Sequence, residues 1–352
     1  MMPEEWPIAA PAADDSAPAR SAARDRLSTV RADFFLDSAT RLTEQERALM
    51  TAMLHCLVSD VADDLRSALP KGWAAANDET NLDLIEALTT TRLLDEPALM
   101  ALLLRRADEE RITNGARARS GRHDARILQG LVSHENGAVS AAAMALILAR
   151  GRRRDRFGQC LVAFDDLAPA SARALVHAIA AVLRGSLAAM RPVTSVDTGL
   201  VAASQRVLAD QDGSRGIDAL TGELTRLLEE NGRLDDELIL AAAHEGEIGF
   251  VADALGRRAG LAGAIAADEM LSGSAERVMT LFRLAGLPRE LVAGFLASIG
   301  DLLGIADAGH AIGLFDAMTD DQAASAQTWL TADPAYRRAL ALLDVDDGQR
   351  TL

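Results

Sequence analysis

The chain has 352 residues, 49% of them hydrophobic, so it is long enough to bury most of its unfolded surface in a packed core. Aromatic residues are only 3%, and alanine and leucine supply most of the apolar side chains, which favours helices over sheets. The formal net charge of −16 disfavours a general nucleic-acid binder or a protein that binds anionic membranes.

Residues 1–20 are rich in Ala, Pro and Asp, and we expect a disordered tail there. We interpret Trp6 and Ile8 within it as a chance apolar pair rather than a docking motif. The N-terminus lacks the basic start and apolar stretch of a signal peptide. The longest uncharged apolar run, 138–149, has 12 residues, whereas a bilayer span needs about 20. We therefore expect a cytoplasmic protein that does not cross a membrane.

From residue 21 onward the pattern predicts one helix after another. The clearest is 43–69, where Thr43 and Glu46 form a capping box and apolar residues recur at i, i+3, i+4 and i+7. Shorter helices are expected at 81–92, 96–107, 108–119, 123–133, 138–151 and 154–163, and a long one at 169–190.

A helix near 197–209 is expected to bridge to a second set of helices that begins at Ile217. In that set, residues 235–260 form a predicted helix pair that is split at His244–Gly246, and Pro288 opens another helix. The predicted organisation is a disordered tail at 1–20, an N-terminal helical-repeat subdomain at 21–190, a bridging helix and linker at 191–216, a C-terminal helical-repeat subdomain at 217–343 and a frayed tail at 344–352.

The steady two-helix rhythm is the main indication of fold class. A short helix pair cannot bury its apolar stripe alone and must stack on its neighbours. The sequence therefore predicts an all-α protein, a HEAT- or armadillo-like α-solenoid of stacked helix pairs.

Several short segments resemble a known bacterial family. They are Gly232-x-Leu234, Leu238–Ile239, the His-Glu-Gly turn at 244–246, the helix around Phe250, Ala285-Gly286-Leu287, and the stretches 42–69 and 127–140. On these grounds residues 25–300 resemble the alphaproteobacterial family called domain of unknown function 2336, although residues 70–82 depart from its pattern. The resemblance implies a helical, HEAT-like fold and carries over no catalytic residues.

The charge is unevenly distributed along the chain. Residues 105–156 hold twelve arginines and six acidic residues, a net charge of +6, whereas residues 201–352 hold twelve basic and twenty-five acidic residues, a net charge of −13. The densest basic stretch is "ARGRRRDR" at 149–156, which follows an apolar helix.

Three interpretations of this stretch stay open. In the first interpretation it is a solvated turn, whose cations interact favourably with the C-terminal end of the preceding helix. Alternatively, it docks an acidic surface, on a partner protein or on the acidic C-terminal half of this chain, since guanidinium groups bind carboxylates in a bidentate manner. In the third interpretation it binds nucleic acid, although Phe157 is the only aromatic residue beside it that could stack on a base.

For the docking interpretation the candidate residues are Arg117, Arg119, Arg122, Arg150, Arg152, Arg153, Arg154 and Arg156. The expected partner is a protein with an acidic surface, and nucleic acid is disfavoured. The sequence does not predict an oligomeric state.

No pattern for catalysis, a cofactor or a metal is found. The six histidines lack the spacing of metal ligands, and we interpret Cys56 and Cys160 as reduced core thiols. Consecutive acids such as Asp235–Asp236 point about 100° apart on a helix and do not form an acid–base pair.

We therefore expect a non-enzymatic protein–protein interaction scaffold or regulatory adaptor. The alternative is a nucleic-acid-binding helical-repeat protein that uses residues 105–156. A helical-repeat enzyme that acts on a small molecule is a third possibility.

Overall fold

In a computed structural model of the chain, the described residues are 42–73, 81–91, 93, 94, 96–120, 126–333, 336, 337 and 339. Glu44–Leu352 form one compact unit, to which every element below belongs. The predicted tails at 1–20 and 344–352, with Trp6 and Ile8, lie outside the described residues, and so does Arg122.

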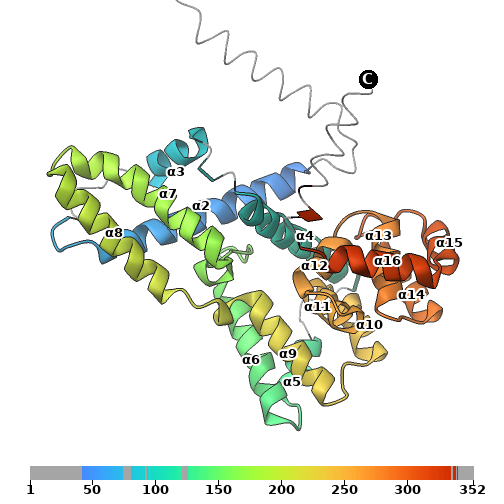
Figure 1. The fold of residues 1–352 in the computed structure, drawn as a ribbon. Coiled ribbons are helices and arrows are strands. Elements are labelled where there is room, and N and C mark those ends of the chain that lie inside the picture. The colour runs from blue at the N-terminus through green and yellow to red at the C-terminus, as the bar shows by residue number, and fades with distance from the viewer. Residues whose placement is uncertain are drawn as a thin grey trace, which may run out of the picture. The chain divides into compact units, whose positions relative to one another are not determined.

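The regular secondary structure of the described residues is entirely helical, which confirms the all-α prediction (Figure 1). The α-helices are α2 (Glu44–Ala68), α3 (Asn81–Thr90), α4 (Pro97–Ser120), α5 (Arg126–Val132), α6 (Gly137–Arg152), α7 (Pro169–Ala188), α8 (Val193–Asp210), α9 (Ile217–Glu230), α10 (Asp236–His244), α11 (Ile248–Ala259), α12 (Gly263–Met270), α13 (Ala275–Leu284), α14 (Arg289–Phe295), α15 (Ala308–Ala317) and α16 (Asp320–Thr331). The short helical segments among these same residues are η2 (Phe164–Asp166), η3 (Gly213–Arg215) and the π-helical η4 (Leu296–Gly300). Within the described part of the chain, no helix has both the length and the apolar character needed to span a membrane.

The predicted helix at 43–69 is confirmed as α2. Its inward-facing residues recur every three or four positions, as the amphipathic pattern requires. They include Met50, Met53, Leu57, Val58, Val61 and Leu65. The predicted pair at 235–260 is also confirmed, because α10 ends at His244 and α11 begins at Ile248.

The prediction of two separate helices at 96–107 and 108–119 was wrong, because α4 runs through both segments without a break. No Gly or Pro interrupts the junction. Ion pairs one turn apart, Arg106 with Glu109 and Asp108 with Arg111, stabilise the helix across it.

The predicted helix at 154–163 was also wrong. This segment turns back on itself through an isolated antiparallel bridge between Arg154 and Cys160. The carboxylate of Asp155 accepts hydrogen bonds from the backbone amides of Phe157 and Gln159, and Gly158 adopts a φ of 81°. The Asp and the Gly are turn-forming residues, and their local preferences outweigh the apolar spacing around them.

Buried residues gather in two clusters. The first core is formed by α2, α3, the N-terminal half of α4, α7 and α8. Within it α2 contacts the other four helices. A 25-residue helix at the centre of such a group must be apolar on several sides, and α2 carries the broad stripe that this position requires.

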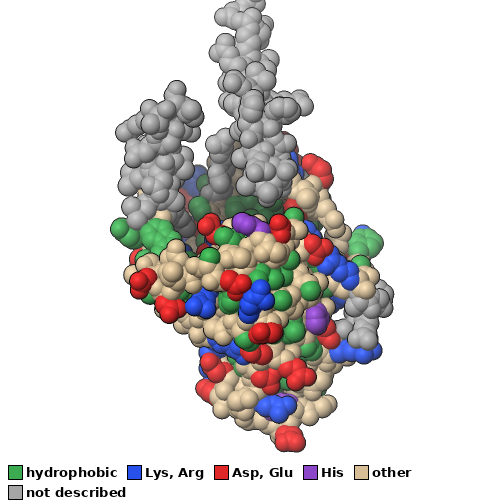
Figure 2. All heavy atoms as spheres, turned by 90° about the vertical axis from the view of Figure 1, so that its right-hand side faces the viewer, with side chains coloured by type: hydrophobic (Ala, Val, Ile, Leu, Met, Phe, Trp, Pro, Cys, Tyr) green, Lys and Arg blue, Asp and Glu red, His purple; other side chains and the backbone are tan. Residues whose placement is uncertain are grey.

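The second core is formed by α5, α6 and α9 to α16, together with Ile112 of α4. Its centre includes Phe282 and Phe295, whose ring centroids lie 5.1 Å apart. On the side of the molecule that carries α13 to α16, hydrophobic, acidic and basic side chains are interspersed rather than gathered by type (Figure 2). The subdomain boundaries predicted at residues 190 and 217 stay a prediction.

One helix contributes to both cores. Leu99, Leu102 and Leu103 of α4 lie in the first core, and Ile112, further along the same helix, lies in the second. Because a helix is stiff along its length, α4 holds the two cores at a set spacing. Between these two sets, Arg106, Glu109 and Glu110 of α4 line a cavity, which is the candidate site.

Candidate functional site

The site is built around residues Arg150–Arg156, which we call the arginine segment. It consists of the last turn of α6 and the tight turn that follows. Asn136 caps the start of α6 by accepting a hydrogen bond from the amide of Ala138, and the helix ends at Arg152. The change from helix to turn sends neighbouring arginines in different directions.

Three residues of the segment, Arg150, Arg153 and Arg154, point inward, and we call them the inner arginines. Arg150 forms an ion pair with Glu247, whose side chain is only 4% exposed. In Arg153 the Nε donates to a carboxylate oxygen of Asp166 at 2.8 Å.

The third inner arginine, Arg154, binds Glu110 in a bidentate manner, with distances of 2.9 and 3.0 Å from its two terminal nitrogens to the carboxylate oxygens. The three acidic partners come from three different elements: Glu110 lies on α4, Asp166 lies in η2, and Glu247 directly precedes α11. Of these three acids only Glu247 lies in the acidic C-terminal half of the chain, and the docking interpretation stays a prediction.

Two residues of the segment, Arg152 and Arg156, point outward, and we call them the outer arginines. Both are exposed, and neither pairs with an acid within the described residues. The guanidinium of Arg156 lies 4.6 Å from the ring centroid of Phe157, and this phenylalanine is 74% exposed.

Apolar side chains continue this outward face along α6. Met144 is 42% exposed and Leu148 is 53% exposed. Met144, Leu148 and Arg152 are four residues apart and therefore lie on one side of the helix. We call Met144, Leu148, Arg152, Arg156 and Phe157 together the outer patch.

Two further predicted docking residues, Arg117 and Arg119, do not belong to the outer patch. Arg119 forms an exposed ion pair with Asp301, next to η4. Arg117 is half-buried and lines the cavity described below. The structure therefore separates the described members of the predicted set into cavity-lining residues and outward-facing residues.

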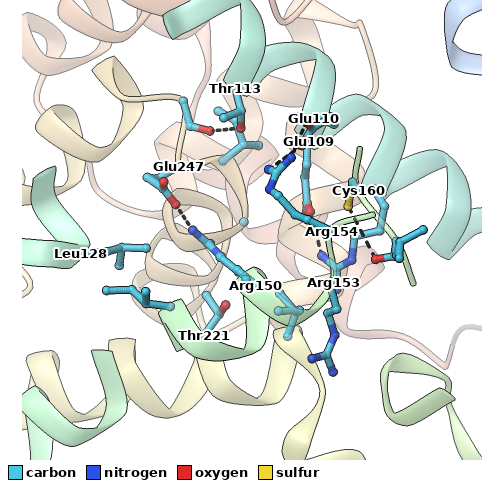
Figure 3. Close-up of a pocket in the computed structure, with 18 of the residues that line it drawn as sticks. Glu109, Glu110, Thr113, Leu128, Arg150, Arg153, Arg154, Cys160, Thr221 and Glu247 are labelled. Atoms are coloured by element: carbon cyan, nitrogen blue, oxygen red, sulfur yellow. Dashed lines mark hydrogen bonds and ion pairs between the residues drawn. The ribbon is translucent and has the colours of Figure 1, made fainter. Parts of the chain in front are cut away.

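Behind the arginine segment lies a partly enclosed cavity of about 210 Å³ (Figure 3). Its walls come from α4, α5, α6, the turn after α6, α9, the α10–α11 turn and the start of α11. Arg150 points toward Glu247 and Arg154 points toward Glu110, whereas the side chain of Arg153 runs away from both glutamates. Apolar side chains complete the wall, including Leu128, Ile147, Ile217 and Ile248.

Sequence reasoning missed one deeply buried charge of this site, that of Arg106. Arg106 is 4% exposed and binds Glu109 at 2.7 Å and Asp218 at 2.5 Å. Burial opposes its charged form, but Glu109 and then Asp218 hold its pKa above the ordinary value, so the guanidinium stays charged. The spacing of Arg106 and Glu109 on one helix was visible in the sequence, whereas Asp218 carries no local signal.

A close backbone contact positions the α10–α11 turn against α4. The hydroxyl of Thr113 donates to the carbonyl oxygen of Gly246 at 2.7 Å. Gly246 has a φ of 73°, and a Cβ added there would lie 2.8 Å from Cα of Thr113. Only glycine fits this turn without strain, and the turn places Glu247 opposite Arg150.

The thiol of Cys160 lines the same cavity. Burial and, secondarily, the nearby Glu110 carboxylate raise its pKa to about 11. A thiol with this pKa is protonated at neutral pH and is a weak nucleophile. No cluster of three or more His, Cys, Asp or Glu side chains in the described part of the chain could hold a metal ion.

Comparison with known proteins adds one finding. The family model described as "Uncharacterised protein conserved in bacteria (DUF2336)" matches residues 116–327, which include the arginine segment and all of α5 to α15. Searches among curated proteins and among solved structures returned no match.

Proposed function

The chain belongs to the DUF2336 family of bacterial proteins, and from this premise we propose that it is a cytoplasmic, non-enzymatic protein–protein interaction scaffold or regulatory adaptor. Its helix pairs stack in a HEAT-like manner. Serial contacts in the second core support this arrangement, because α10 contacts α11, α11 contacts α12, and α12 contacts α13.

The observation that carries the proposal is the outer patch. It combines two exposed aliphatic side chains and an exposed phenylalanine with two arginines that lack an acidic partner among the described residues. Aromatic residues, methionine and arginine are enriched at protein interfaces, and a phenylalanine 74% exposed to water gains free energy when a partner covers it.

Charge complementarity indicates the chemistry of the partner. The outer arginines present two cations beside the apolar side chains, so we expect a partner segment that carries apolar residues flanked by carboxylates. Bidentate binding of carboxylates by Arg152 and Arg156 would orient that segment on the patch.

The inner arginines argue against the nucleic-acid alternative. Three of the five arginines of the segment are neutralised by Glu247, Asp166 and Glu110. Nucleic-acid affinity depends on many cations that reach phosphates, and this segment offers only two.

The test uses the full chain in quantitative affinity enrichment from the source bacterium, followed by binding measurements with the recovered partner. Two variants address the patch: Leu148→Ser with Phe157→Ser, and Arg152→Glu with Arg156→Glu. The matched control is Val201→Ser on α8, because Val201 is 56% exposed but lies outside the patch. We expect both patch variants to weaken binding about 30-fold, which corresponds to about 2 kcal/mol, and the control to bind normally.

Three outcomes would contradict the proposal. One is a partner that binds all variants equally well. Another is turnover of a small molecule by the purified chain. The third is nucleic-acid binding that weakens steeply with salt and is lost when Arg152 and Arg156 are replaced.

A further inference from the structure

The cavity behind the arginine segment takes no part in the outer patch, and its charges have a distinctive arrangement. Five arginines are among the residues that line it: Arg106, Arg117, Arg150, Arg153 and Arg154. The guanidinium of Arg153 is bound to Asp166, which does not line the cavity. Four carboxylates line it as well, those of Glu109, Glu110, Asp218 and Glu247. With Arg153 set aside, four arginines and four acidic residues line the cavity, so its positive and negative charges are balanced.

Two of the resulting ion pairs stand apart from each other in the wall. Arg150 of α6 pairs with Glu247, and Arg154 of the following turn pairs with Glu110 of α4 (Figure 3). Each pair offers a cation and an anion to anything that enters between them.

This arrangement discriminates between classes of ligand. A simple anion would draw a guanidinium away from Glu247 or Glu110 and leave a largely buried carboxylate without its cation. A simple cation would leave a guanidinium unpaired in the same way. A zwitterion avoids both penalties, because its carboxylate contacts an arginine while its ammonium contacts a glutamate.

We propose that this cavity binds a zwitterionic small molecule of the α-amino-acid class. The ligand carboxylate faces Arg150 and Arg154, and its ammonium faces Glu110 and Glu247, so that charges alternate around it. The volume of about 210 Å³ lies below the roughly 300–1,000 Å³ of pockets for drug-sized ligands, which fits a molecule of this size.

The apolar part of the wall indicates the side chain that the ligand carries. Leu128 and Ile248 are buried, and Ile147 is half-buried beside them. These residues favour an aliphatic amino acid, which would exclude water from the two ion pairs and strengthen them.

The first experiment measures binding to the full chain by calorimetry, starting from L-leucine within a panel of the twenty L-amino acids. Two analogues dissect the charges: 4-methylpentanoate lacks the ammonium group, and 3-methylbutylamine lacks the carboxylate. We expect at least one aliphatic amino acid to bind saturably, and each single-charge analogue to bind at least ten times more weakly.

A set of variants assigns the site. Glu110→Gln and Glu247→Gln should each weaken amino-acid binding more than tenfold. Asp301→Asn is the matched control, because it also removes a carboxylate that pairs with an arginine, Arg119, outside the cavity. It should leave the affinity unchanged.

A second measurement needs no substitution and therefore does not depend on the folding of a variant. Cys160 lines the cavity, whereas Cys56 does not. A saturating amino acid should slow alkylation of Cys160 at pH 9 at least fivefold and leave Cys56 unaffected.

Several results would overturn the proposal. They are the absence of saturable binding by any amino acid of the panel, equal affinity for 4-methylpentanoate, and unchanged alkylation of Cys160 at saturation. Any of these results would mean that the ion pairs of the cavity stabilise the folded chain and do not bind an amino acid. Because the variants of the outer patch do not alter the cavity walls, failure of this proposal is separable from failure of the docking function.

Discussion

At the scale of single residues, arginines close together in the sequence have opposite environments. Arg150 pairs with Glu247, which is almost completely buried, whereas Arg152 is exposed and has no acidic partner among the described residues. A buried carboxylate is tolerated only when a cation or several hydrogen-bond donors compensate its lost hydration. Arg150 is therefore needed for the fold, and Arg152 is available for binding.

This difference predicts the effect of two matched substitutions. Arg150→Gln leaves the Glu247 carboxylate buried without its cation, and we expect the free energy of unfolding to fall by about 3 kcal/mol. Arg152→Gln makes the same chemical change on the surface and should alter the free energy of unfolding by less than about 0.5 kcal/mol. Urea unfolding of both variants measures the difference, and equal stabilities would contradict the assigned roles.

Cys160 gives a second prediction at this scale. With a pKa of about 11, roughly one thiol in a thousand is ionised at pH 8. We expect iodoacetamide to label Cys160 at least a hundred times more slowly than an unperturbed cysteine in a short peptide. The rate should rise about tenfold per pH unit up to pH 10. Rapid labelling of the folded chain at pH 7 would show that the thiol is ionised and accessible, and would contradict this prediction.

At the scale of elements, the turns decide how the helices meet. The α10–α11 turn approaches α4 so closely that Gly246 has no room for a side chain. The α13–α14 turn contains Gly286 with a similar φ of 67°, but a Cβ added there would meet open space. The two glycines thus share a backbone conformation and differ in their surroundings.

We predict that Gly246→Ala destabilises the chain more than Gly286→Ala. Both substitutions place an L-residue in the left-handed region, which costs about 1–2 kcal/mol. Only Gly246→Ala adds a clash with the backbone of Thr113, so this substitution should lower the free energy of unfolding by about 3 kcal/mol or more. Thermal unfolding of the two variants checks the order, and a larger loss for Gly286→Ala would refute the close approach.

At the scale of the whole molecule, the shared helix α4 and an ion-pair network join the two cores. Arg105 and Arg106 of α4 both bind Asp218 near the start of α9. Although burial opposes ionisation of Asp218, Arg106 and then Arg105 lower its pKa below the ordinary value of 3.8. The carboxylate therefore stabilises the folded chain in its charged form.

The sign of this shift predicts how stability depends on pH. A carboxyl group with a lowered pKa in the folded chain stabilises it fully above about pH 4 and loses that contribution as the pH falls through the lowered pKa. We expect the Asp218→Asn variant to have a lower free energy of unfolding than the unmodified chain at pH 7. This difference in stability should become smaller between pH 4 and pH 2. Urea unfolding midpoints of both chains at pH 7, 4 and 2 measure this difference. A difference that stays constant with pH would exclude a pH-dependent contribution of Asp218 to stability.

Much of the element structure was predictable because helix formation depends on neighbours three and four positions away. The apolar spacing in 43–69 predicted α2, and the Glu-Gly turn after His244 predicted the α10–α11 pair. The predictions failed where two local signals competed. At 154–163 the turn formed by Asp155 and Gly158 replaces the helix that the apolar spacing predicted. At 107–108 ion pairs one turn apart stabilise a continuous α4 where two separate helices were predicted.

The amino-acid sequence alone determined that the chain is helical, that it belongs to its family, and that basic residues are densest in one arginine-rich stretch. Only the tertiary structure decided which arginines turn inward and which remain outside. The partner of Arg150 lies 97 residues away, and a partner of Arg106 lies 112 residues away. Ion pairs between such distant residues form only after the helices have packed, so no local pattern encodes them.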